Sequence, residues 1–283
     1  MHISEINIYP IKSLKGISLN SATVEARGLR HDRRWMLTDT AGKFFTQREF
    51  PRMALIEVGV ASNSDDGGLY VTAEKFGTLE IPLSPDTGNR QRVTIWQSVC
   101  DGDVYPAVVN EWFGDVLGAN CQLVYMPDDS RRHVNPRFDR GDDVVSFADG
   151  YPLMLLGENS LADLNSRLEI PLPMNRFRPN LVVSGSGAFA EDDWTRIRIG
   201  EAIFRSSKPC ERCVITTVEQ SIGEFTGKEP LKTLASYRMA KMVMPERLET
   251  LGVSETAVLF GQNLIAETVS GTIKIGDKIE ILA

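Results

Sequence analysis

Two of the four cysteines, Cys210 and Cys213, stand three positions apart. Lys208 and Arg212 flank them, and a nearby cation favours the thiolate, which is the form of cysteine that attacks an electrophile or binds a metal. The run that follows, Val214 to Val218, is rich in β-branched residues and predicts a strand. We therefore expect Cys213 to lie where a loop enters a strand.

Spacing alone leaves four interpretations of this pair. A zinc site normally has four ligands, whereas Cys100 and Cys121 are isolated and the three histidines, His2, His31 and His133, are scattered. A thioredoxin-like redox pair opens a helix after a strand, and Val-Ile-Thr-Thr-Val is poor helix sequence. A disulfide is unusual in a cytosolic protein. Two half-buried cysteines in a core hairpin agree best with the spacing.

The composition is that of a globular protein. The 283 residues are 42% hydrophobic and 24% charged, which is ordinary and sufficient for one large or two modest domains. A net charge of -7 argues against a general nucleic-acid binder and against a protein of anionic membrane surfaces. We find no apolar run of about 18 residues that would span a membrane, and the first residues do not read as a signal peptide. We therefore expect a cytoplasmic protein.

Short alternating segments separated by turn signals predict a β-rich first half. One helix is expected over Pro106–Leu117, ended by Gly118, and a second over residues 158–167, capped by Ser160 or Asn159. Residues 127–143 are polar, charged and proline-containing, and predict a linker or mobile loop between two halves. The buried face of the first helix should hold Val108, Val109, Trp112, Phe113, Val116 and Leu117.

The second half is expected to contain two hairpins, over residues 194–206 and, at the end of the chain, 273–282. Arginines are clustered at residues 30–34 and at residues 176–178. We expect Arg176 to be a rim charge and Arg30 and Arg34 to lie on the surface or in salt bridges. The basic side chains at residues 30–34 are a local excess in an acidic protein, and a guanidinium offers a planar fork that suits a phosphate.

Six sequence motifs resemble the MOSC family, and within it the branch that holds bacterial YcbX-like proteins and the mitochondrial amidoxime-reducing components. They occur in the family's order and span nearly the whole chain. The motifs lie at Tyr9–Gly16, Gly28–Trp35, Ser160–Asn165, Arg176–Asn180, Cys210–Arg238 and Leu259–Gln262. This resemblance implies an α+β fold that is mainly β. It implies an N-terminal MOSC β-barrel domain over residues 1–125 and a MOSC domain, a β-barrel with peripheral helices, over residues 126–283.

The resemblance also implies a molybdenum–molybdopterin cofactor, with Cys213 as catalytic residue and molybdenum ligand and Cys210 beside it in a structural role. Where mitochondrial members carry small hydroxyl residues this chain has Gly150 and Tyr151, and where they carry an aromatic residue it has Asn263. At family level pyridoxal phosphate binding is also associated. The implied cofactor-binding residues are Lys12, Ser13, Arg33, Asp149, Gly150, Tyr151, Arg178, Asn180, Arg212, Cys213 and Asn263.

By this resemblance the first hypothesis for function is a two-electron reductase of N-hydroxylated compounds such as amidoximes or hydroxylaminopurines. The chain ends at Ala283 without the clustered cysteines of a ferredoxin domain. We therefore expect a separate electron-donor protein, a flavin or iron–sulfur reductase. Two other hypotheses stay open. One is a sulfur carrier or transferase that uses a cysteine persulfide, and the other is a non-catalytic protein that binds and delivers molybdenum cofactor.

Overall fold

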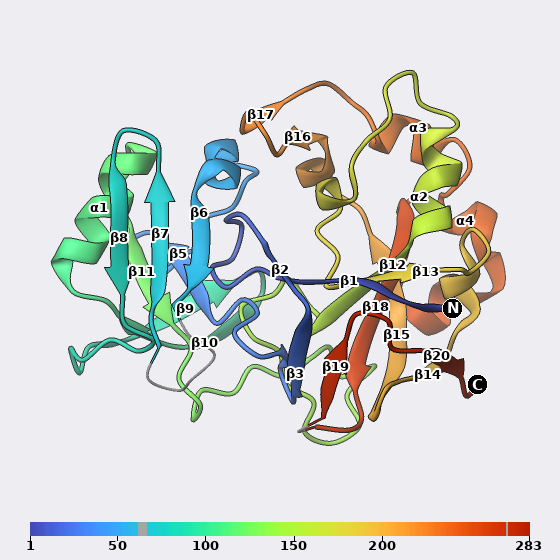
Figure 1. The fold of residues 1–283 in the computed structure, drawn as a ribbon, viewed down its shortest axis with the longest axis horizontal. Coiled ribbons are helices and arrows are strands. Elements are labelled where there is room, and N and C mark those ends of the chain that lie inside the picture. The colour runs from blue at the N-terminus through green and yellow to red at the C-terminus, as the bar shows by residue number, and fades with distance from the viewer. Residues whose placement is uncertain (62–66, 270) are drawn as a thin grey trace.

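The computed structural model describes residues 1–61, 67–269 and 271–283, and its strands form two groups that lie side by side (Figure 1). The larger group is an eight-stranded sheet with the order β2-β1-β13-β12-β18-β15-β14-β20. Its strands are β1 (His2–Ile8), β2 (Ile17–Leu19), β12 (Leu153–Gly157), β13 (Leu181–Ser184), β14 (Arg196–Ile199), β15 (Ala202–Glu211), β18 (Leu259–Ala266) and β20 (Ile279–Ile281).

The two ends of the chain close this sheet on itself. The amide of Ile3 donates to the carbonyl of Asp277 at 3.0 Å, and the amide of Ile279 donates to the carbonyl of Met1 at 3.2 Å. The start of β1 therefore reaches the segment that leads into β20, and N- and C-terminus lie close together in Figure 1. The enclosed core includes fully buried residues such as Ile6, Leu155 and Phe204, each of which contributes about 1.5–3 kcal/mol by leaving water.

The second group of strands holds a four-stranded sheet, β5-β11-β10-β9, a three-stranded sheet, β6-β7-β8, and the helix α1 (Figure 1). Trp35, Val71 and Phe113 are among the buried residues of its separate core. The elements are β5 (Trp35–Thr38), β6 (Glu57–Val60), β7 (Leu69–Ala73), β8 (Gly77–Ile81), β9 (Arg90–Ile95), β10 (Ser98–Val104), β11 (Gln122–Tyr125) and α1 (Ala107–Leu117).

Short elements complete the chain, and the fold is mainly β, as predicted. The strands β3 (Ser21–Glu25), β4 (Gly28–Leu29) and β19 (Thr272–Lys274) form one small sheet, and β16 (Val218–Glu219) and β17 (Glu224–Phe225) form another. No helix in the described ranges has the length and apolarity needed to cross a membrane. The helices are α2 (Glu158–Asn165), α3 (Leu231–Ala235), α4 (Ala240–Val243) and α5 (Leu248–Leu251), and the 3-10 turns are η1 (Pro51–Leu55), η2 (Met174–Arg176), η3 (Ala190–Asp193), η4 (Val214–Thr217) and η5 (Pro245–Arg247).

The two groups do not divide the chain at a single point. The strands β1 and β2 precede the boundary predicted at residue 125, yet β1 pairs with β13, which follows it, and β2 joins the same sheet by pairing with β1. The division into domains over residues 1–125 and 126–283 stays a prediction, and its boundary does not coincide with the division of the strands between the two groups.

Both predicted helices are present, but details of their surfaces differ. Helix α1 ends at Gly118, whose φ of 65° is left-handed, as expected for a glycine cap. Val109 and Phe113 are buried, whereas Val108 is 64% exposed, so its assignment to the buried face was wrong. Helix α2 begins after Gly157 with no side-chain cap, so neither Ser160 nor its neighbour caps it. Ser160 is buried and donates to the carboxylate of Glu191 instead.

Two predictions for the second half were wrong, a strand at residues 214–218 and a hairpin at residues 273–282. Residues 214–217 form the 3-10 turn η4, because the Thr216 hydroxyl donates to the Cys213 carbonyl at 2.9 Å and the Thr217 hydroxyl to the Val214 carbonyl at 2.8 Å. Such local bonds compete with a strand ladder. Residues 273–282 contain strand segments but no hairpin: β19 pairs with β3 and β20 with β14. Alternation predicts a strand but not its partner. The hairpin of β14 and β15 is confirmed.

Candidate functional site

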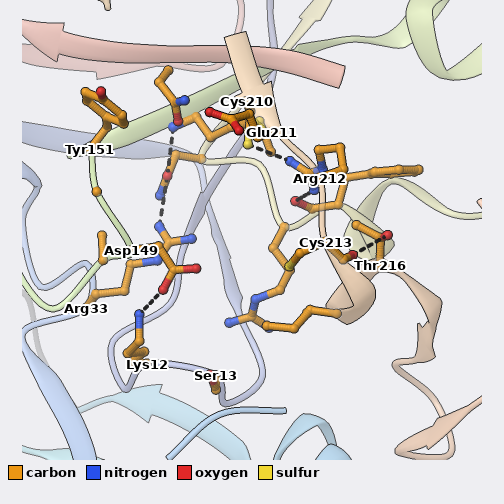
Figure 2. A pocket seen from close by; sticks show the side chains of 18 of the residues that line it. Lys12, Ser13, Arg33, Asp149, Tyr151, Cys210, Glu211, Arg212, Cys213 and Thr216 are labelled. Atoms are coloured by element: carbon orange, nitrogen blue, oxygen red, sulfur yellow. Dashed lines mark hydrogen bonds and ion pairs between the residues drawn. The ribbon is translucent and has the colours of Figure 1, made fainter. Parts of the chain in front are cut away.

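A cavity of about 160 Å³ brings together all eleven residues that the resemblance implicated (Figure 2). What each of them binds stays a prediction. The cavity is lined by Lys12, Ser13, Arg33, Asp149, Gly150, Tyr151, Arg178, Asn180, Arg212, Cys213 and Asn263, together with Gln47, Arg176, Cys210 and neighbouring residues.

Loops at strand ends deliver nearly all of these side chains, which is where a rigid scaffold usually places binding groups. Of the eleven predicted residues, Asn263 alone lies within a strand, β18. The turn after β1 holds Lys12 and Ser13, the turn before β5 holds Arg33, the segment before β12 holds Asp149–Tyr151, the segment before β13 holds Arg178 and Asn180, and the segment after β15 holds Arg212 and Cys213.

Three of the lining residues have left-handed backbones although none is a glycine. Ser13 has a φ of 69°, Arg33 of 50° and Arg178 of 55°. Non-glycine residues occupy this region rarely and at a cost in free energy, and they cluster at functional sites. Main-chain bonds hold the turns in place, since the Lys12 amide donates to the Trp35 carbonyl at 2.8 Å and the Arg33 amide to the Tyr9 carbonyl at 3.0 Å.

Lys12 and Asp149 form an ion pair at one wall of the cavity. The lysine side chain is only 6% exposed, and burial lowers its pKa from 10.5 to about 8 despite the nearby carboxylate. Burial alone would raise the pKa of Asp149, but Lys12 and Arg48 hold that pKa well below its usual range. The Asp149 carboxylate therefore stays charged and forms an ion pair with Lys12, the side chain that a bound anion would contact.

A second group of polar residues surrounds the ring of Tyr9. The guanidinium of Arg33 lies 4.5 Å from the ring centroid and donates to Asp32 at 2.5 Å and to the Asn180 side-chain oxygen at 2.9 Å. Asn180 also accepts from the Met154 amide at 3.2 Å and donates to the main chain of β1. Its amide is thus mostly engaged by the protein, and it holds Arg33 in place.

Arg178 is the least compensated cation of the site. Its guanidinium lies 4.1 Å from the centroid of the Tyr9 ring, but it has no hydrogen bond or ion pair with residues in the described ranges. Burial and the positive charge of Arg33 lower the pKa of Arg178 to about 10. An anion bound beside it would relieve this cost.

Each of the two cysteines of the site accepts a hydrogen bond from an arginine. Arg48 donates to the sulfur of Cys213 at 3.0 Å, and Arg212 donates to the sulfur of Cys210 at 3.0 Å. Cys213 precedes η4, whereas Cys210 lies within β15 and packs partly against an apolar cluster. Both thiols are free. Cys213 is therefore the thiol that the loop presents, and Cys210 the one held by the sheet.

The remaining predicted residues make limited contacts. Tyr151 packs edge-on against Phe138 with ring centroids 5.7 Å apart, and Asn263 donates to the Pro209 carbonyl at 3.4 Å. A side chain at Gly150 would meet nothing within 4 Å. These three positions line the cavity and make few side-chain hydrogen bonds, so their main contribution is to the shape of the cavity.

Comparison with known proteins assigns the chain to a family. The MOSC N-terminal beta barrel domain matches residues 1–120, and the MOSC domain matches residues 142–280. Mitochondrial amidoxime-reducing component 1 of Homo sapiens is 33% identical over an alignment of 293 positions, which covers 99% of this chain and 82% of the human protein. The chain belongs to the MOSC family.

Other relatives of this MOSC protein carry two kinds of name. Mitochondrial amidoxime-reducing component 1 of Mus musculus is 34% identical over 99% of this chain and 82% of its own length. Molybdenum cofactor sulfurase of Oryza sativa subsp. japonica is 33% identical over 85% of this chain, a match that covers 31% of that longer protein.

Arg132, which positions one wall of the MOSC site, was not predicted from the sequence. Arg132 lies in the segment expected to be a mobile linker, yet it is 5% exposed. Its guanidinium donates to the carbonyls of Ser146 at 2.7 Å, Ala148 at 2.5 Å and Asp149 at 2.8 Å. The segment is therefore anchored, and Arg132 fixes the turn that carries Asp149.

Two further contacts at the cavity wall were also missed. Arg176, expected at the rim, is 1% exposed and pairs with Glu219, so that expectation was wrong. Gln47 is fully buried, donates to the Ser13 carbonyl at 2.7 Å and accepts from Gln220 at 3.0 Å. Neither pairing has a local sequence signal, because the partners are more than forty and more than one hundred and seventy positions apart.

The arginine expected at the surface, Arg34, is also largely buried. It is 8% exposed, donates to Asp128 at 2.6 Å and lies 5.1 Å from the ring centroid of Tyr125. Arg34 was expected on the surface or in a salt bridge, and the salt bridge to Asp128 agrees with that expectation. Arg34 lies outside the cavity, and so does not compete with Arg33 for a ligand.

These residues agree in charge with an anionic cofactor. The cavity places Lys12, Arg33 and Arg178 around one space, and two of the three have pKa values lowered by burial. A half-open cavity of about 160 Å³ is comparable to cavities that hold one benzene-sized ring, so a larger cofactor would extend beyond it. No group of three or more His, Cys, Asp or Glu side chains within the described part of the chain could hold a metal ion. A metal here would need ligands that the cofactor brings.

Proposed function

We propose that this MOSC protein is a molybdenum-cofactor-dependent reductase of N-hydroxylated compounds. The observation that carries the proposal is the accessible Cys213 thiol in a cavity lined by cations from distant parts of the chain. Relatives named amidoxime-reducing components, 33–34% identical over 99% of the chain, support the substrate class.

The chain's residues would divide the work. Lys12, Arg33 and Arg178 would hold the anionic part of the cofactor, and Cys213 would supply the protein's ligand to molybdenum, for which soft sulfur is suited. When bound, the cofactor supplies the two-electron redox chemistry. Reduction of an amidoxime to an amidine breaks the N–O bond, consumes two electrons and two protons and releases water.

The electrons would come from a separate protein of the flavin or iron–sulfur class. Cys100 and Cys121 are buried in two different apolar clusters, away from Cys210 and Cys213. The four cysteines of this sequence therefore do not gather into one cluster-binding set within the described residues. We therefore propose that a separate protein donates the electrons.

Sulfur transfer is the second candidate, and the rice relative named molybdenum cofactor sulfurase favours it. In that case Cys213 would carry a persulfide, and the Arg48 N–H would donate to its sulfur. A persulfide carrier needs a reactive thiol but no resident molybdenum. The two candidates therefore differ in what the purified protein contains.

The test is turnover of benzamidoxime by protein purified from a host that makes molybdenum cofactor, with reduced methyl viologen as electron donor. We expect benzamidine to form in proportion to bound molybdenum. Sulfur released by cyanide from Cys213, with no molybdenum, would establish the sulfur carrier instead. Bound molybdenum with no turnover of any N-hydroxylated compound would indicate a cofactor-delivery protein.

A further inference from the structure

Arg48 connects the first group of strands to the sulfur of Cys213. It lies in the segment between β5 and η1, and its Nη2 atom donates to the Cys213 sulfur at 3.0 Å across 165 positions of sequence. The other cysteine of the site has a local donor, because Arg212 lies two positions from Cys210 and donates to that sulfur. The bond from Arg48 therefore distinguishes Cys213 and comes from a different part of the fold.

The donor approaches this sulfur from outside the cavity. Of the described residues, Cys213 lines the cavity and Arg48 does not. The Arg48 side chain is 22% exposed, and its guanidinium carbon lies 4.6 Å from the centroid of the Trp96 ring. The same Nη2 atom lies 3.7 Å from the Asp149 carboxylate. The guanidinium is therefore held behind the sulfur, and the side of Cys213 that faces the cavity stays available to a metal.

The backbone that carries Arg48 is held by the protein itself. The Arg48 amide donates to the Thr46 hydroxyl at 3.1 Å. The side chain of Gln47 is fully buried and exchanges two hydrogen bonds with that of Gln220, at 3.0 and 3.3 Å. Gln220 lies in the turn between β16 and β17, in the segment that follows Cys213. This amide pair therefore ties the donor's segment to the cysteine's segment, and a donor fixed in this way needs no reorganisation when a ligand binds.

A hydrogen bond to a metal-bound thiolate acts on the metal as well as on the sulfur. The bond draws electron density from the sulfur, which stabilises the more negative, reduced form of the centre and raises its reduction potential. It also fixes the direction in which the ligand points. Hydrogen bonds from ionised donors are the stronger kind. A guanidinium 3.0 Å from the Cys213 sulfur is placed to have both effects.

We propose that Arg48 is a positioning residue for the molybdenum ligand. Its N–H···S bond directs the Cys213 sulfur toward the cavity and raises the reduction potential of the metal that this sulfur binds. The first group of strands then contributes to the chemistry, because it supplies the donor to a cysteine of the second group. This inference rests on the molybdenum binding in the proposed function. Arg48 keeps its proton throughout and takes no part in breaking the N–O bond.

The test is a titration of the molybdenum-loaded protein with dithionite, without substrate, followed through the EPR signal of Mo(V). Dithionite supplies the one electron that converts Mo(V) to Mo(IV). In Arg48→Ala the equilibrium constant of this reduction should fall about tenfold, which is a shift of about 59 mV to lower potential. The g-values of the signal should also change, because the spin density on the sulfur changes. Arg48→Lys keeps a charged N–H donor and should recover part of both effects.

Two further variants complete the design. Arg92→Ala is the matched control for charge, because the Arg92 side chain is 71% exposed on β9 and its removal changes the net charge equally. Its potential and g-values should equal those of the wild type. If Arg48→Ala does not retain molybdenum, Arg48→Gln takes its place, since it keeps a neutral donor in place of the charged one. Its potential should shift in the same direction.

The outcomes separate this inference from the function beneath it. Wild-type turnover of benzamidoxime together with unchanged potentials in the Arg48 variants would overturn the inference alone. An equal shift in Arg92→Ala would also overturn it, because the effect would then come from net charge. Bound molybdenum without turnover would remove the proposed function and leave the titration to decide on Arg48. A wild-type protein without molybdenum would remove both together.

Discussion

Anion binding at the candidate site should depend on the protonation of Lys12. Burial lowers the pKa of Lys12 to about 8, so the side chain is about 90% charged at pH 7 and about 10% charged at pH 9. A phosphate that needs the charged form should therefore bind about tenfold more weakly at pH 9, a loss of about 1.4 kcal/mol. Phosphomonoesters have their second pKa near 6, so the ligand keeps its charge over this range.

The assay is calorimetric titration of the cofactor-free protein with phenyl phosphate between pH 7 and 9. Lys12→Arg is the matched control, because an arginine stays charged throughout and should give a flat profile. Asp149→Asn removes the carboxylate that raises the lysine pKa, so its midpoint should move below pH 8. A flat profile in the wild type, or the same slope in Lys12→Arg, would show that phosphate binding does not depend on the charge of Lys12.

Two predictions concern the residues that hold the site. Arg132→Ala removes three hydrogen bonds from a buried guanidinium to carbonyls. We expect it to lower the free energy of unfolding, measured by denaturant titration, by about 3 kcal/mol. The control is Arg131→Ala, at a side chain that is 63% exposed, which should change that free energy by less than about 0.5 kcal/mol; equal losses in the two variants would contradict the role given to Arg132. Arg176→Met removes the buried ion-pair partner of Glu219, which is 27% exposed and keeps its hydrogen bond from the Ser221 hydroxyl, so it should cost about 1–3 kcal/mol. Adding Glu219→Gln should recover part of that loss in a double-mutant cycle; strict additivity would show that the two side chains do not interact.

The sequence predicted the mainly β fold, helix α1 and the eleven residues that meet in one cavity, because motifs identified a family with a known arrangement. Sequence periodicity gave wrong predictions where the structure of a segment depends on its hydrogen-bond partners or its strand partners. The strand predicted at 214–218 became η4 because Thr216 and Thr217 bond to nearby carbonyls. The strands at the C-terminal end pair with β3 and β14 rather than with each other.

The site residues that sequence missed share one property, which is that their meaning lies in distant partners. Arg132 looks like part of a charged loop until its carbonyl acceptors are seen, and Arg176 looks like a rim charge until Glu219 covers it. Arg48 gives no motif of its own, yet it alone donates to the Cys213 sulfur among the bonds observed. A single sequence contains no measure of such contacts.

We propose that Cys213 binds molybdenum in a cofactor held by this cavity. The most direct test is molybdenum and pterin content of the wild type, Cys213→Ala and Cys210→Ala, each purified from a host that makes the cofactor. We predict near-stoichiometric molybdenum in the wild type and in Cys210→Ala, and its loss from Cys213→Ala. Molybdenum retained in Cys213→Ala but lost from Cys210→Ala, or absent from all three proteins, would contradict the claim.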